Sequence, residues 1–124
     1  MFSPQLEKTA FRFGNGEYAF SSSDVLLAIS ERETLGRAIL GGEVYVVQGN
    51  VVHAMPHVDG RGPSLIHWET PSRQQRETWK QFVVRSAEFT RQAFRAIQSD
   101  ERSIQLPPGG RIVYNLTWDE ESGE

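Results

Sequence analysis

The sequence predicts an α+β fold, a small antiparallel sheet with one long amphipathic helix packed across it and a shorter N-terminal helix. Residues 72–98 place apolar side chains on one arc at helical spacing. Residues 44–54 are rich in β-branched side chains on either side of Gly49-Asn50, which is typical of a tight hairpin. Residues 111–118 alternate with period two, which indicates a closing strand with one buried face.

Length and composition are those of one soluble domain. The 124 residues are 38% hydrophobic and 23% charged, so the chain can bury a core of its own. We expect a single domain over residues 1–118 and an acidic flexible tail over 119–124. The lack of cysteine excludes a disulfide framework, a zinc ribbon and a thiol nucleophile. With no apolar leader and no run near the roughly 18 apolar residues of a membrane span, the expected location is the cytoplasm.

The N-terminal third predicts two short extended pieces and one helix. Gly14-Asn15-Gly16 has the composition of a turn between the two extended pieces. A helix is predicted from Asp24 to Leu35, with Ser22 or Ser23 as the N-cap and Gly36 just past the end. The side chains expected to face inward are Val25, Leu26, Ile29 and Leu35.

The strands are predicted from runs of β-branched residues and from the glycine and turn residues that interrupt them. Strands are predicted over 44–48 and 51–54, and a short one within 65–70. Gly41 and Gly42 precede the first of these strands, where glycine usually marks a bend or bulge. In the closing strand, the side chains expected to face inward are Ile112, Tyr114, Leu116 and Trp118.

The long helix has the strongest pattern. Pro71 blocks upstream continuation, and Ser72 with Gln75 matches a capping box. A helix over 72–98 would be about 40 Å long and must lie across the sheet. Its apolar arc consists of Trp79, Phe82, Val83, Ala87, Phe89, Ala93, Phe94 and Ile97. Ser86 and Thr90 lie at the centre of this arc, where small side chains allow close packing, and a catalytic role for either is disfavoured.

Three histidines raise the possibility of a small metal-dependent enzyme. His53, His57 and His67 lie near carboxylates, and imidazole and carboxylate groups are ligands for zinc or iron. Pro56 and the preceding strand pattern argue against a helix here, so the four-residue interval between the first two loses its geometric meaning. The preferred interpretation is histidines at a strand end and in a loop, with no metal and no cofactor. The sequence has no recognised catalytic or phosphate-binding motif.

The basic residues of the helical segment raise a second alternative, a nucleic-acid module. Residues 72–98 carry six bases and two acids, and Glu77 and Glu88 interrupt the basic surface. The whole protein has a net charge of -3 and a pI near 5.6, so a solvated helix face is preferred and no nucleic-acid or membrane partner is expected. The basic residues expected on the outer face are Arg73, Arg76, Lys80, Arg91 and Arg95.

Several segments together resemble a known family. "ILGGEV", Ile39 to Val44, follows a short helix and precedes a strand pair. A Trp-containing segment and a long helix of the form W..FV.RS.E....A come after it. The matching residues of these two parts are Trp68, Trp79, Phe82, Val83, Arg85, Ser86, Glu88 and Ala93. Over roughly residues 24–98 the chain resembles the immunity protein 40 family of bacterial polymorphic toxin systems, with Glu43 where the family pattern has Asp.

The resemblance implies a small, non-catalytic protein that binds and neutralises a cognate toxin domain. We expect the chain itself to be a monomer or a homodimer. Binding needs a rigid surface with aromatic anchors and charges that steer association. The partner-binding residues expected on this basis are Glu43, Tyr45, Asp59, Trp68 and Glu69. For Trp68, packing in the core is as good an explanation as partner binding. For Glu43, the alternative to partner binding is a hydrogen bond with a neighbouring backbone amide. A generic protein-interaction domain is the remaining alternative.

Overall fold

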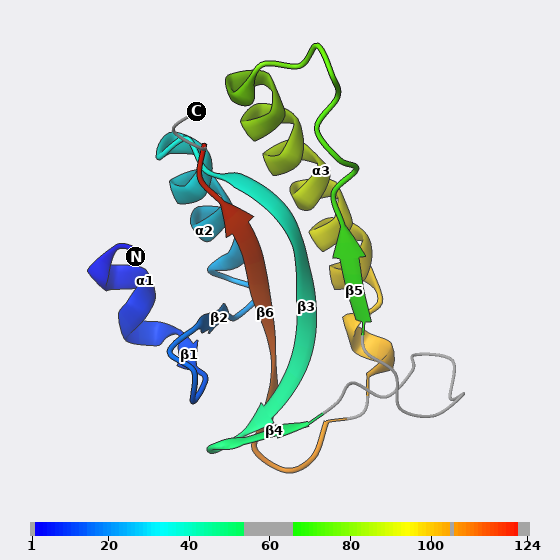
Figure 1. Cartoon of the computed structure of the whole chain (residues 1–124). Coiled ribbons are helices and arrows are strands. Elements are labelled where there is room, and N and C mark those ends of the chain that lie inside the picture. The colour runs from blue at the N-terminus through cyan, green and yellow to red at the C-terminus, as the bar shows by residue number, and fades with distance from the viewer. Residues whose placement is uncertain (1, 54–65, 105, 122–124) are drawn as a thin grey trace.

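The computed structural model describes residues 2–53, 66–104 and 106–121, and it has the α+β architecture predicted from the sequence. All strand pairs in the described part are antiparallel, in the order β1-β2-β6-β3-β4, with β5 beside β3 (Figure 1). The strands are β1 (Phe11–Arg12), β2 (Tyr18–Phe20), β3 (Ala38–Gln48), β4 (Val51–His53), β5 (Ile66–Glu69) and β6 (Gly110–Asp119). The helices are α1 (Pro4–Thr9), α2 (Val25–Thr34), α3 (Trp79–Ser99) and the 3-10 turn η1 (Glu101–Ser103).

β3 is the centre of the sheet. It pairs with β6 along its whole length, and its other edge pairs first with β5 and then with β4. The hairpin at Gly49-Asn50 is confirmed, and Gly49 has the positive φ of +57° that such a turn requires. β3 begins at Ala38, well before the predicted start at Val44. Pairing on both edges holds the glycine-containing segment in the sheet, against its low intrinsic β propensity.

Gly41 and Gly42 lie at a β-bulge, as predicted. The β3–β6 register shifts between Ile39 and Gly41. A Cβ on Gly41 would lie 2.5 Å from the backbone oxygen of Trp68, and one on Gly42 only 2.3 Å from its indole ring. Both positions therefore require glycine, because the backbone and side chain of β5 pass directly against β3.

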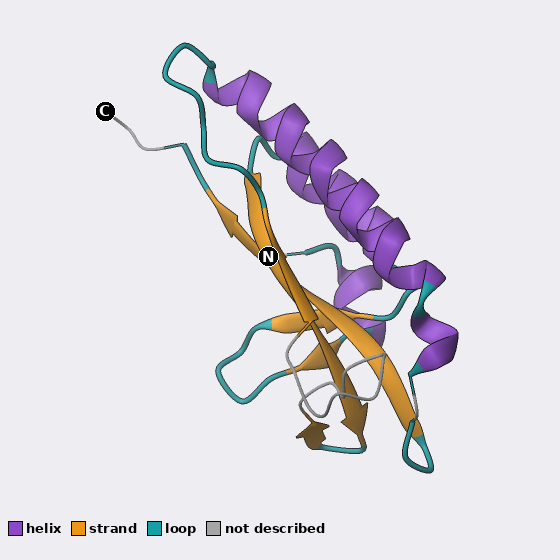
Figure 2. Cartoon of the chain, turned by 90° about the vertical axis from the view of Figure 1, so that its right-hand side faces the viewer, coloured by secondary structure: helices purple, strands orange, loops and turns teal. Residues whose placement is uncertain are grey.

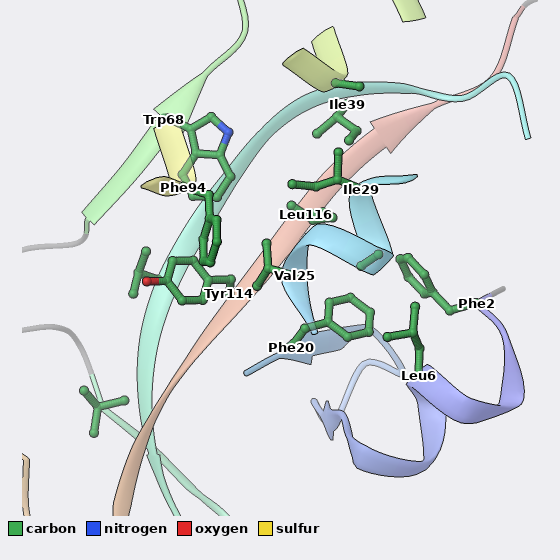
Figure 3. Close-up of a cluster of buried hydrophobic side chains, with 14 of the residues drawn as sticks. Phe2, Leu6, Phe20, Val25, Ile29, Ile39, Trp68, Phe94, Tyr114 and Leu116 are labelled. Atoms are coloured by element: carbon green, nitrogen blue, oxygen red, sulfur yellow. The ribbon is translucent and has the colours of Figure 1, made fainter. Parts of the chain in front are cut away.

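The main core lies between the sheet and the helices. Seen along the sheet, α2 and α3 lie on the same face (Figure 2). The core residues drawn and labelled in Figure 3 include Phe2, Leu6, Phe20, Val25, Ile29, Ile39, Trp68, Phe94, Tyr114 and Leu116. Ser86 joins the helix to the bulge, because its Oγ accepts a hydrogen bond from the Ile39 N–H at 3.0 Å and donates one to the Val83 carbonyl at 2.9 Å.

α3 packs on its predicted arc but begins later than predicted. Its N-cap is Thr78, which forms a capping box with Gln81, so the expected box at Ser72 and Gln75 is wrong. The helix has 21 residues and is therefore about 31 Å long. Residues 71–77 stay outside it because Arg85 fixes them in another conformation, donating to the carbonyls of Pro71 and Ser72 and to both carboxylate oxygens of Glu77.

The two N-terminal helices, α1 and α2, also differ from the predictions made from the sequence. α1 was not predicted, although Ser3 caps it and proline occupies its first position. α2 has Asp24 at its N-cap position without a side-chain cap, so neither Ser22 nor Ser23 caps it. Leu26 and Leu35, expected inside, are 39% and 57% exposed.

Arg32, in contrast to these two leucines, is a buried residue of α2. Arg32 is 1% exposed, and its guanidinium carbon lies 3.5 Å from the ring centre of Phe2 and 4.3 Å from that of Trp118. Burial and the nearby Arg37 lower its pKa to about 10, so it stays charged at neutral pH. Cation–π stacking between two rings that are distant in sequence allows a charged residue inside this core.

β6 has buried residues on both faces, not on one as predicted. Tyr114 and Leu116 face the helices, whereas Val113 lies in a second cluster with Ala19 and Val47. Phe11 and Phe13 cover this cluster from the β1–β2 region. Within the described residues, no helix is long and apolar enough to cross a membrane.

Candidate functional site

The sheet has an open face, opposite α2 and α3, which carries polar side chains from three strands. In an antiparallel pair, residues that lie opposite each other point to the same face. The open face is defined here by Glu43 and Tyr45 of β3, His67 and Glu69 of β5, and Asn115 and Thr117 of β6. The bulge sets this arrangement, because Gly41 and Gly42 let β5 approach β3 closely enough to bring Glu69 beside the central strands.

Glu43 and Tyr45 form a pair on this face. The Tyr45 hydroxyl donates a hydrogen bond to a carboxylate oxygen of Glu43, so the partner of Glu43 is a side chain and not the backbone amide considered from the sequence. Burial and the adjacent carboxylate raise the pKa of Tyr45 to about 12, so it remains a neutral donor at physiological pH. Phe13 packs edge-on against Tyr45, with ring centres 5.3 Å apart. The carboxylate is thus fixed in direction while it stays partly exposed.

Two neighbouring hollows lie along the open face and share Glu43 and Thr117. The first, the turn-side hollow, measures about 470 Å³ and is lined by Phe13, Gly14, Asn15, Glu17, Glu43, Tyr45, Asn115 and Thr117. The second, the β5-side hollow, measures about 480 Å³ and includes Glu69, His67, Gly41, Gly42 and Trp68 in its lining. Carboxylates therefore line both hollows.

The structure brings together three of the five residues predicted to bind a partner. Glu43, Tyr45 and Glu69 lie on the open face. Trp68 points to the other face and is 8% exposed in the core, which is the packing alternative considered for it. Asp59 lies outside the described residues.

Sequence reasoning missed Glu17, Asn115 and Thr117 as members of this surface. Asn115 and Thr117 could have been found from the alternation of the closing strand, which puts them on the face opposite Tyr114 and Leu116. No local pattern indicates Glu17, because it joins the surface only through the packing of the β1–β2 turn against the sheet.

The histidines that suggested a metal-dependent enzyme do not form a cluster in the described part of the chain. His53 Nε2 lies 3.3 Å from Gln48 Oε1, His67 is on the open face, and His57 is outside the described residues. In the described ranges, no group of three or more histidines, cysteines or carboxylates is placed to hold a metal ion.

The expected basic helix face is smaller than predicted. Arg73 and Arg76 precede α3 and are not part of it. Arg91 pairs with Glu33 at 2.6 Å and with Glu88 at 3.5 Å, so its charge is compensated locally. Lys80 and Arg95 are exposed on the helix, as expected for a solvated face.

Comparison with known protein families gives a match over most of the chain. The profile of a protein family described as Immunity protein 40 matches residues 9–106, which include both strands of the N-terminal hairpin, β3 to β5 and all of α3. No curated protein and no solved structure matches the chain significantly.

Proposed function

The chain belongs to the immunity protein 40 family, and from this membership we propose that it binds and neutralises a cognate toxin domain of a bacterial polymorphic toxin system. The match over residues 9–106 is the observation that carries the proposal, because it spans most of the folded chain. In this proposal the protein acts in the cytoplasm of its producer by binding alone, without catalysis and without a cofactor.

We place the toxin-binding surface on the open face. This face is rigid, because it is built on paired strands, and it carries a fixed carboxylate at Glu43 and an exposed one at Glu69. Phe13 and Tyr45 supply aromatic area beside the charges, and aromatic side chains are frequent anchors of protein interfaces. Trp68 would support this surface from the core side and would not contact the toxin.

Co-expression tests the proposal. We expect a gene for a toxin domain next to the gene of this chain, and that domain is expressed in a bacterial host with and without the chain. We expect the chain to restore growth and to co-purify with the domain. No rescue of growth and no complex would refute the proposed function.

Two charge-reversed variants locate the surface. Glu43→Lys with Glu69→Lys alters the open face, and Glu88→Lys with Glu121→Lys makes the same charge change away from it, at exposed positions. We expect the first pair to abolish rescue and the second to retain it. Urea unfolding of both variants checks that each is folded. Equal rescue by both would place the interface elsewhere.

A further inference from the structure

The helix side of the molecule carries exposed apolar side chains near one end. The C-terminal end of α2, the N-terminal end of α3 and the end of β6 lie at this end (Figure 1). Leu35 is 57% exposed, more than any other large hydrophobic side chain of the described residues, and Val84 is 50% exposed. Leu27, two helical turns before Leu35, is 42% exposed. Burial of this apolar area against a partner would be favourable.

Leu35 stands between two hollows on this side. The α2 hollow measures about 480 Å³ and lies between Phe2 and the face of α2 that carries Leu27 and Leu35. The α2–α3 hollow measures about 820 Å³ and has Trp79, Val84 and Leu35 in its lining. No residue that defines the open face lines either hollow. An exposed side chain beside a hollow gives one patch both a knob and a hole, which is the self-complementary shape that a two-fold contact between identical surfaces requires.

The charges of the α2–α3 hollow are of both signs. Glu33 and Arg37 are neutralised within the chain by ion pairs of 2.6 and 3.1 Å. Lys80 and Glu121 are exposed in the lining, and neither forms an ion pair with a described residue. A strongly acidic or strongly basic partner would match one of these two charges and repel the other. A second copy of the same surface matches both.

The size of this surface fits a weak, reversible dimer. Twelve residues line the α2–α3 hollow and seven line the α2 hollow, with Thr34 and Leu35 common to both. A standard interface has about 20–30 residues on each side, so this patch is slightly smaller. We therefore expect a dissociation constant on the order of 10–100 µM.

We propose that two copies of the chain form a symmetric dimer through this helix-side surface, which is defined by Leu27, Leu35, Trp79, Lys80, Val84 and Glu121. Leu35 of each copy packs into the α2–α3 hollow of the other, against Trp79 and Val84, and Lys80 of each copy meets Glu121 of the other. The dimer uses no residue of the open face, which stays accessible on both copies. This inference does not depend on the proposed function.

Sedimentation equilibrium of the full chain between about 1 and about 500 µM tests the proposal, because this range brackets the expected dissociation constant. The test variant combines Leu35→Glu and Val84→Glu. The matched control combines Val51→Glu and Leu106→Glu, whose side chains are 55% and 45% exposed outside the surface. We expect the unmodified chain and the control to dimerise and the test variant to stay monomeric at every concentration. Urea unfolding of each variant checks its fold.

A charge swap tests the arrangement without changing the apolar contacts. Lys80→Glu and Glu121→Lys each place like charges opposite each other across the two-fold axis, so each alone should weaken the dimer about 5- to 20-fold. The two together restore opposite charges in exchanged positions. The dissociation constant should then return to within about threefold of that of the unmodified chain.

An unmodified chain that stays monomeric over the whole range would overturn the inference. A test variant that dimerises as tightly as the control would also overturn it, since the interface would then lie elsewhere, as would a double charge variant that dimerises no more tightly than either single one. If the unmodified chain is monomeric and the test variant no longer rescues growth, the toxin occupies this surface and a second copy does not. A dimer that behaves as expected while the chain gives no rescue would refute the proposed function and leave this inference standing.

Discussion

Adding one methyl group at Gly42 tests the packing on which the open face depends. An ideal Cβ at this position would lie 2.3 Å from Cζ2 of Trp68, 2.4 Å from its Cη2 and 2.7 Å from the backbone oxygen of Asn115. Neither neighbour can give way cheaply, since the ring is 8% exposed in the core and the oxygen belongs to a paired strand. Overpacking a core costs 1–3 kcal/mol, and displacement of a whole indole ring places Gly42→Ala near the upper end, at about 3 kcal/mol.

Urea unfolding followed by tryptophan fluorescence measures this cost. With a slope of about 2 kcal/mol per molar urea, the midpoint should fall by about 1.5 M. Gly14→Ala is the matched control, because its Cβ would meet no atom within 4 Å, and it should change stability by less than about 0.5 kcal/mol. Equal midpoints for the two alanine variants would refute the reasoning.

A double-mutant cycle identifies the cause of the destabilisation. Trp68→Leu removes the atoms that the new methyl group would meet first, and leaves the backbone oxygen of Asn115. In that background Gly42→Ala should therefore cost clearly less than it does alone. An unchanged cost would show that the clash with the indole ring is not the source.

Three further substitutions test α3 and the segment before it. Ser86→Ala leaves a buried backbone N–H unpaired and should cost about 1–3 kcal/mol in urea unfolding. Thr78→Ala removes the N-cap and should cost about 1 kcal/mol by the same measurement. Arg85 lowers the pKa of Glu77 from 4.5 to about 2, so their pair stabilises the fold fully above pH 4.5 and loses this contribution as pH falls toward 2. Unfolding midpoints measured over this range should fall more steeply for the unmodified chain than for Glu77→Gln.

Each of these predictions has a control. Thr90→Val removes a buried hydroxyl of the same helix face that has no partner among the described residues, so it should be neutral or stabilising, unlike Ser86→Ala. Ser72→Ala should be nearly neutral if the helix begins after Thr78. Equal losses at Ser72 and Thr78 would contradict the observed N-cap, and parallel acid profiles for the unmodified chain and Glu77→Gln would contradict the lowered pKa.

Local periodicity was sufficient to predict most of the elements. The arc of α3 and the closing strand were predicted because their apolar side chains repeat with the period of the element. The hairpin at Gly49-Asn50 was predicted because β-branched runs flank a pair of turn residues. The start of α3 was predicted wrongly, because two capping boxes are possible in the sequence. Arg85 favours the later one by fixing residues 71–77 outside the helix. Arg32 was missed because a buried arginine depends on rings at both ends of the chain.

The candidate site, like the fold, was predicted from the sequence only in part. From sequence alone, the glycine pair was predicted to mark a bend or bulge, and Glu43, Tyr45 and Glu69 to belong to a binding surface. Only the tertiary structure decided that these three share a face, that Glu17 and Thr117 join them and that Trp68 does not. The physical reason is that a strand sequence encodes an alternation of faces but not its partner. The bulge at Gly41 and the pairing of β3 with β5 and β6 set the register, and a shift of one residue would send every one of these side chains to the opposite face.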